Sequence, residues 1–175
     1  MKDFSTERLH LRKLRADDRR RVFECWASDE EVARYVTWNA HQNEETTGFV
    51  LDMWLKEYEN PDCFRFGIEL RETGELIGMI DVVDYIDGAP EIGYVLGRAY
   101  WGKGYMTEAL SAVTDRLFSE GFTTVVIEAD ERNIGSNIVI KKNGFVFTHK
   151  ETKPCSRFKP EIVNVNWYRK DKPEQ

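Results

Sequence analysis

The spacing of apolar side chains changes along the chain, and its first part predicts one strand and two helices. Residues 7–14 alternate apolar and polar positions, which is typical of a short strand. Asp17 and Asp18 open a helical pattern, and a second pattern begins after Asn43 and ends before Pro61. The apolar faces expected for these two helices are Val22, Phe23, Trp26 and Ala27, and Phe49, Val50, Met53, Trp54 and Tyr58.

The remainder of the chain predicts a meander followed by alternating helices and strands. The strands are expected at residues 63–70, 76–85, 91–96, 123–129, 145–150 and 162–168, the first three forming the meander. The helices are expected at residues 105–119 and 136–143, ended by Gly121 and Gly144. The fold class predicted is α/β of the mixed α+β type, with a largely antiparallel sheet of about seven strands and about four helices.

Composition excludes several classes of protein. The chain has 175 residues, 41% hydrophobic and 32% charged, and no internal repeat or linker, so we expect residues 1–175 to form one ordered domain. Its apolar runs are too short for a membrane span, and its start lacks the apolar stretch of a signal peptide, which favours a cytoplasmic protein without membrane contact. Cys25, Cys63 and Cys155 lie far apart and are expected to be free thiols.

The net charge of -6 argues against nucleic-acid binding, and its distribution is uneven. Residues 61–130 carry 13 acidic and 5 basic side chains, whereas residues 131–175 carry 5 and 10. One part of a site built from both segments would favour an anionic cofactor and the other a cationic substrate. A solvated surface of mixed charge is the plain alternative.

The glycine-containing segment of residues 97–106 joins a predicted strand to a long helix. The first amides of a helix lack internal partners and carry partial positive charge, so such a junction binds anions. The segment matches a nucleotide-binding P-loop except at Gly104, which replaces the hydroxyl that holds magnesium. A Mg-dependent P-loop-like phosphotransferase is therefore an alternative function, and a simple glycine turn is an alternative without function.

Five segments of the chain resemble, in order, the GCN5-related N-acetyltransferase (GNAT) superfamily, and within it the RimJ/RimL-like branch. They are residues 6–12, residues 91–96, the loop and helix start at residues 100–110, Asn133-x-x-Ser136, and Lys142-Asn143-Gly144-Phe145. The resemblance covers almost the whole chain. It implies a cytoplasmic N-acetyltransferase that uses acetyl-CoA as co-substrate and needs no metal.

The resemblance also implies how acetyl-CoA binds. Strand 91–96 splays from its neighbour, and Val95 and Leu96 pair with the pantetheine arm. The amides that wrap the pyrophosphate belong to Trp101, Gly102, Lys103, Gly104, Tyr105, Met106 and Thr107. Trp101 and Met106 depart from the usual loop pattern, so Met106 is expected to point its side chain away from the phosphates.

Transfer of acetyl to an amine needs a base for the amine and a proton for the departing thiolate. Glu91 is the candidate base, with an exposed edge carboxylate as the alternative. Many relatives protonate the thiolate with a tyrosine where this chain has Ile140, so Ser136 becomes the thiol partner unless it only caps its helix. The resemblance assigns Asn133 to the pantetheine amide and Lys142 to the 3′-phosphate, where a solvated lysine is the default interpretation.

The acceptor is left open between a protein N-terminus and a small-molecule amine. The charge pattern favours a cationic acceptor. Trp38 is expected in the core, and the alternative that the resemblance implies is that it and its neighbours form the acceptor-side wall and shape substrate access. A non-catalytic acyl-CoA-binding sensor is a further alternative because the usual tyrosine is absent. A homodimer is common among similar proteins, and no partner nucleic acid is expected.

Overall fold

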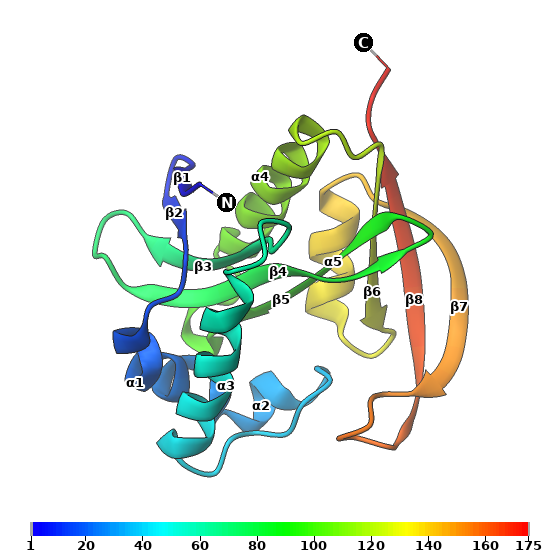
Figure 1. The fold of residues 1–175 in the computed structure, drawn as a ribbon. Helices are drawn as coiled ribbons and strands as arrows, with labels where there is room; N and C mark the ends of the chain where they lie inside the picture. Colours follow the sequence, from blue (N-terminus) through cyan, green and yellow to red (C-terminus); the bar gives the residue numbers. More distant parts are fainter. Residues whose placement is uncertain (1, 175) are drawn as a thin grey trace.

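A computed structural model describes residues 2–174, which form one mixed eight-stranded sheet with five α-helices (Figure 1). The strand order is β1-β2-β3-β4-β5-β6-β8-β7. The strands are β1 (Phe4–Ser5), β2 (Leu9–Arg12), β3 (Arg65–Leu70), β4 (Leu76–Ile86), β5 (Ala89–Leu96), β6 (Thr124–Asp130), β7 (Val146–Pro154) and β8 (Ile162–Asp171). The helices are α1 (Arg19–Val22), α2 (Glu30–Ala33), α3 (Glu44–Glu57), α4 (Tyr105–Ser119) and α5 (Ile134–Lys142). The predicted fold class is confirmed, with one strand and one helix more than expected.

The additional elements lie in the N-terminal part. β1 has only two residues and pairs with β2, so it carries no detectable alternation of its own. The helix expected after Asp17 is present but irregular, because a 3₁₀ turn at Ala16–Asp18, α1 and a π-helical turn at Phe23–Ala27 follow one another; α2 is the additional helix. The wide π turn still places Trp26 in the core, where 1% of its surface is exposed.

Helix α3 begins where the sequence predicted, since the side chain of Asn43 accepts a hydrogen bond from the Thr46 amide. Its expected apolar face is partly wrong. Leu51 is buried, but 68% of Phe49 and 44% of Met53 are exposed. The helix instead turns Thr47, Gly48 and Leu51 inward.

The strands β3, β4 and β5 form the predicted antiparallel meander. The next strand, β6, runs parallel to β5, and within residues 2–174 the two strands share one pair, Glu91 with Val126. Beyond that pair they diverge, which confirms the splayed central strands that the resemblance implied. The divergence leaves the C-terminal half of β5 without a strand partner on its β6 side.

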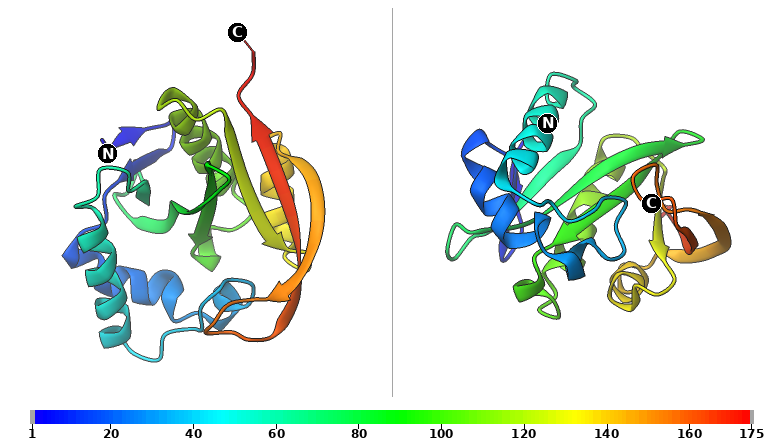
Figure 2. Two further views of the ribbon diagram at one scale, coloured as in Figure 1. Left: turned by 45° about the vertical axis from the view of Figure 1, so that its right-hand side comes forward. Right: turned by 90° about the horizontal axis from the view of Figure 1, so that it is seen from below.

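The sheet separates two helical layers. Figures 1 and 2 show α1, α2 and α3 on one face and α4 and α5 on the other. The buried face of α4 is the predicted one and includes Met106, Leu110, Val113 and Leu117. Gly121 follows it with a φ of 104°, the left-handed conformation that ends helices.

Helix α5 begins two residues earlier than predicted, with Asn133 as its N-cap. Its buried Asn137 ties it to the sheet: the side-chain amide donates to the carbonyls of Asp130 and Asn133, and its Oδ1 accepts bonds from Asn166 and Tyr168. Three of these bonds, those with Asp130, Asn166 and Tyr168, fix α5 against β6 and β8. The N-terminus of α5 is thereby held beside the splayed part of β5 and β6.

The C-terminal hairpin of β7 and β8 reaches back to the N-terminal half of the protein. The Lys159 ammonium donates to the carbonyls of Ala33, Arg34 and Val36. Further bonds run from Ser156 Oγ to Thr37, from Cys155 Sγ to Val36 and from the Asn39 amide to the Phe158 carbonyl. We call these contacts between residues 33–39 and 155–159 the loop clasp.

Candidate active site

A cleft of about 460 Å³ lies where the C-terminal end of β5 meets the N-termini of α4 and α5. Predicted cofactor-binding residues that line it are Val95, Leu96, Trp101, Gly102, Gly104, Tyr105, Met106, Thr107, Asn133, Ser136 and Lys142. Two predicted site residues, Lys103 and Glu91, are not among the described residues that line this cleft. The fold thus brings together groups that lie up to 47 residues apart.

The loop before α4 is shaped by two glycines in the left-handed region. Gly102 has a φ of 74° and Gly104 a φ of 79°, and Gly104 is the N-cap of α4. The side chain of Met106 is 5% exposed and packs into the core. The first amides of α4 are therefore free to meet an anion in the cleft.

Arg8 supports this loop from outside the cleft, a role that the sequence did not reveal. Its guanidinium donates to the Lys103 carbonyl at 2.9 Å, pairs with Glu108 at 2.7 Å and lies over the Tyr105 ring at 4.7 Å. Burial opposes ionisation of Glu108, but hydrogen bonds from Thr6 and Arg8 outweigh it and lower the pKa of Glu108. Arg8 follows Thr6 in the family-like start of the chain, which was the available signal.

The end of β5 offers backbone groups to the cleft. Val95 pairs with Met79 and Leu96 with Gly78 on β4, while their β6 side has no strand partner within residues 2–174. The Trp101 indole donates to the Leu96 carbonyl at 2.7 Å. Trp101 therefore fastens the glycine loop to β5, a function that needs its side chain rather than its amide.

The N-terminus of α5 distinguishes the two interpretations of Ser136. Asn133 Oδ1 accepts the Ser136 amide at 3.1 Å and caps the helix. The capping interpretation of Ser136 is therefore wrong, because Ser136 lies inside the first turn. Its Oγ is instead 2.8 Å from the hydroxyl of Tyr94, a cleft residue that the sequence did not single out.

The position that holds a tyrosine in many relatives faces away from the cleft. Ile140 is 0% exposed and belongs to the main core cluster. On the same helix, Lys142 lines the cleft, and Lys141 is not among the described residues that do. Of these two neighbouring lysines, the cleft is therefore lined by Lys142.

Glu91 lies at the point where β5 and β6 part. Burial, followed by repulsion from the Glu128 and Asp84 carboxylates, raises the pKa of Glu91 to about 7 against the attraction of Lys153. Lys153 is itself paired with Glu128. A carboxyl group that titrates near neutral pH fits a general base, and an ordinary exposed edge carboxylate would not show this shift.

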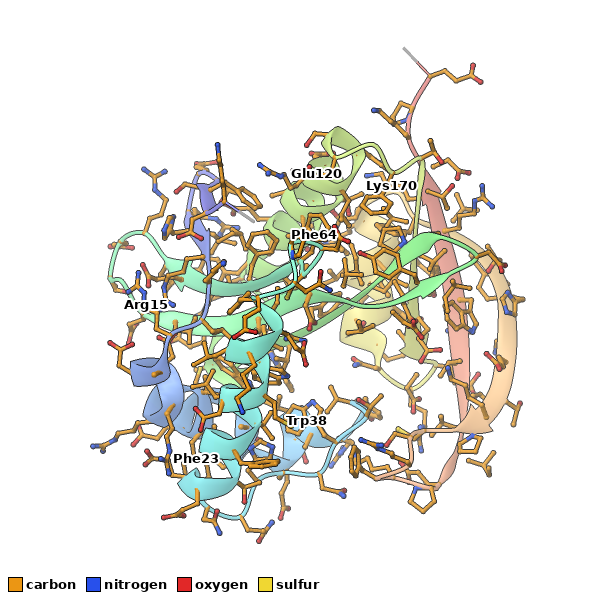
Figure 3. The ribbon with its side chains drawn as sticks, viewed as in Figure 1. Arg15, Phe23, Trp38, Phe64, Glu120 and Lys170 are labelled. Carbon is orange, nitrogen blue, oxygen red and sulfur yellow. The ribbon has the colours of Figure 1, made fainter. Side chains whose placement is uncertain are left out.

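Helix α2 and the segment after it close the other side of the cleft, with Glu31 of the helix and Tyr35 and Val36 of the segment among the lining residues. Trp38 packs against the core cluster that contains Trp26 and Leu51, which confirms that it is a core residue; Figure 3 labels it in the segment between α2 and α3. A second cavity of about 550 Å³ adjoins the loop clasp, and Tyr35 lines both cavities.

The described residues contain no cluster of three or more histidine, cysteine, aspartate or glutamate side chains arranged to bind a metal ion. None of the helices described has the length and apolar character needed to span a bilayer. The three thiols are half-buried and unpaired, and burial raises the pKa of each.

Comparison with known proteins decides the family. A family model described as the acetyltransferase (GNAT) domain matches residues 8–146. The chain belongs to the GNAT acetyltransferase family. A GNAT protein of this kind is an acetyl-CoA-dependent acyltransferase, and this activity replaces the phosphotransferase alternative.

Individual relatives agree with this assignment. An uncharacterized N-acetyltransferase, p20 of Bacillus licheniformis, is 34% identical over 140 residues, which cover 77% of this chain and 74% of p20. The crystal structure of a GNAT-family acetyltransferase from Bacillus anthracis is 26% identical, with a TM-score of 0.83 and coverage of 97% of this chain and 98% of that one.

The fold also matches RimL, a ribosomal L7/L12 α-N-protein acetyltransferase solved with coenzyme A. The TM-score is 0.82 at 19% identity, over 97% of this GNAT chain and 98% of RimL.

Proposed function

We propose that this GNAT protein transfers the acetyl group of acetyl-CoA directly to a primary amine, either a protein N-terminus or the amine of a small molecule. The observation that carries the proposal is the parting of β5 and β6 beside the N-termini of α4 and α5. This arrangement combines an anion site, unpaired strand backbone and a carboxyl group that titrates near neutral pH. Acetyl-CoA supplies the activated thioester.

The residues present fit this co-substrate. The amides of residues 102–107 surround the pyrophosphate, whereas the Trp101 amide already donates to the Arg98 carbonyl at 3.2 Å. The backbone of Val95 and Leu96 pairs with the pantetheine arm as a strand would. Asn133 contacts the pantetheine amide and Lys142 the 3′-phosphate. Lys103 contributes its amide only, because its side chain lies over the Tyr100 ring at 5.5 Å.

Glu91 removes the proton of the acceptor amine, directly or through water. A base must be ionised to act, so a pKa of about 7 leaves half of the Glu91 carboxyls active at neutral pH. A backbone amide near Val95 donates to the oxygen of the reacting carbonyl. Ser136 donates a hydrogen bond to the departing sulfur.

The second cavity is the candidate approach for the acceptor, because Tyr35 separates it from the cofactor cleft. Three cationic side chains line it, but each is already partnered: Arg34 with Glu31, Arg132 with Asp130, and Lys159 with the carbonyls of the loop clasp. RimL, whose solved structure shares this fold, is named as an α-N-protein acetyltransferase of ribosomal L7/L12. A protein N-terminus and a small amine both satisfy the chemistry of the site.

Ligand-dependent stabilisation tests the cofactor. Thermal unfolding is measured with CoA, with acetyl-CoA and with Mg-ATP, since a ligand that binds the folded state raises the melting temperature. We expect CoA and acetyl-CoA to stabilise the protein without magnesium. Stabilisation by Mg-ATP alone would refute the proposal.

Release of free CoA thiol from acetyl-CoA then tests the reaction, over a panel of small amines and peptides with free N-termini. We expect release that depends on the amine, and acetylated product by mass spectrometry. Binding of acetyl-CoA without acceptor-dependent release from any amine would favour the non-catalytic sensor. Glu91→Gln serves as the variant with the cofactor site intact.

A further inference from the structure

The hydroxyl of Ser136 has a partner from the opposite side of the cleft. Tyr94 on β5 places its Oη 2.8 Å from Ser136 Oγ and 3.3 Å from the Ser136 carbonyl oxygen. The two residues are 42 positions apart, and both line the cleft. The contact joins a strand of one half of the sheet to the helix that follows β6 of the other half.

The chemistry of two hydroxyls limits what this contact can do. A serine hydroxyl has one proton and can accept bonds at its oxygen. Because the two hydroxyls share one hydrogen bond, the Ser136 proton is free for a sulfur atom in the cleft only when the other hydroxyl is the donor of that bond; the Ser136 carbonyl oxygen, at 3.3 Å, is the more distant acceptor for the same phenol proton. The Ser136 amide is already used by Asn133, which fixes the serine within the first turn of α5.

Tyr94 is suited to be that donor. Its ring packs against the main core cluster, so the position of its hydroxyl is set by the core. Burial raises the pKa of the Tyr94 phenol, and the group therefore keeps its proton at neutral pH. A phenol that stays protonated donates a hydrogen bond continuously and does not itself transfer its proton.

We propose that Tyr94 is a positioning residue whose phenol donates to Ser136 Oγ and thereby directs the Ser136 proton toward the sulfur of the leaving CoA. The inference rests on the proposed function. It also explains how the protein can have Ile140 where many relatives have a tyrosine that protonates the thiolate. Here the groups that act on the thiol come from β5 and from the start of α5, and not from the middle of that helix. No proton leaves Tyr94; the thiolate is stabilised by the Ser136 hydrogen bond until it is protonated by solvent.

The pKa of the CoA thiol in its complex with the protein tests this role without an acceptor or turnover. Thiolate absorbance in the ultraviolet is followed against pH with saturating CoA. A hydrogen bond to the thiolate lowers the thiol pKa, so we expect a value below that of free CoA. Tyr94→Phe should raise the thiol pKa by about one unit, a roughly tenfold loss of thiolate below the pKa.

Two further variants separate positioning from general stability. Ser136→Ala should raise the thiol pKa at least as much as Tyr94→Phe. The double variant should have the same thiol pKa as Ser136→Ala, because Tyr94 acts on the sulfur only through the Ser136 hydroxyl. Tyr168→Phe is the matched control: its buried phenol bonds to Asn137 on the same helix at 2.7 Å. That variant should lower the melting temperature and leave the thiol pKa unchanged.

The outcomes are distinguishable. A thiol pKa that Tyr94→Phe leaves at the wild-type value, while Ser136→Ala raises it, would overturn the role of Tyr94 and leave the proposed function standing. An unchanged value in Ser136→Ala would also overturn it, and this variant does not depend on the folding of Tyr94→Phe. Failure of the unaltered protein to bind CoA would overturn both the inference and the proposed function.

Discussion

The two sides of the proposed site, one for the cofactor and one for the acceptor, are built by different means. The cofactor side is mostly backbone: the loop of residues 101–104 and the first turn of α4 come from one continuous stretch of chain. The proposed acceptor side depends instead on side chains that β5, β6 and β7 bring together beside the cleft, outside its lining: Glu91, Glu128 and Lys153. A backbone site tolerates changes of side chain as long as its conformation holds, whereas a side-chain site depends on each group.

The largest effect is therefore expected on the acceptor side. Glu91→Gln should lower acetyl transfer by about 10²-fold or more, the range typical of a lost general base, with CoA affinity unchanged. Because the carboxylate is the active form, the wild-type rate should rise with pH up to a plateau above about 7. Rate measurements against pH with an accepted amine check both points.

Glu128→Gln refines the same test. Glu128 raises the pKa of Glu91, so its removal should shift the rising part of the pH profile to lower pH without abolishing activity. A pH profile in Glu91→Gln identical to that of the wild type would contradict the assignment of the base.

The second largest effect is expected at Gly104, where the backbone has a conformation that glycine adopts without strain and other residues do not. Gly104→Ala places a side chain at a φ of 79°, which costs roughly 1–2 kcal/mol and displaces the first amides of α4. We expect the dissociation constant for CoA, measured by calorimetry, to increase about tenfold. Gly74→Ala is the control, because Gly74 has a similar φ of 70° but lies in a turn outside the cleft. This variant should lower the stability of the protein and leave its affinity for CoA unchanged.

A smaller effect is expected from the loop clasp. Lys159→Met removes the ammonium that joins three carbonyls and should raise the KM of the acceptor by about fivefold, the effect of one net hydrogen bond. The dissociation constant for CoA should not change. Steady-state kinetics with Lys150→Met, a surface lysine paired with Glu131, provides the comparison. An equal change of the acceptor KM in the Lys159→Met and Lys150→Met variants would contradict a role of the loop clasp in acceptor binding.

The smallest effect is expected from salt. If acidic residues near Glu91 attract a cationic acceptor, its KM should rise by about two- to threefold when the ionic strength increases tenfold, because salt screens exposed charges. An uncharged amine should show no such dependence. A cationic acceptor whose KM does not depend on salt would indicate that the acidic segment, residues 61–130, is an ordinary solvated surface without a role in acceptor binding.

The same contrast explains what the sequence could predict. The bounds of α4, its stop at Gly121 and the anion-binding loop were predictable because each depends on residues within one turn or one helix. The exposed Phe49, the broken helix after Asp17 and the Tyr94–Ser136 contact were not. They depend on which surfaces the sheet presents, and residues 42 or more positions apart decide that.

The divergence of β5 and β6 has an energetic consequence. Three ties of different kinds span the two halves of the sheet: the Glu91–Val126 pair, the Tyr94–Ser136 bond and the loop clasp. They set the width of the cleft before any ligand arrives. A preorganised site loses little conformational entropy of its own on binding, so none of the contacts made by acetyl-CoA is consumed in drawing the halves together.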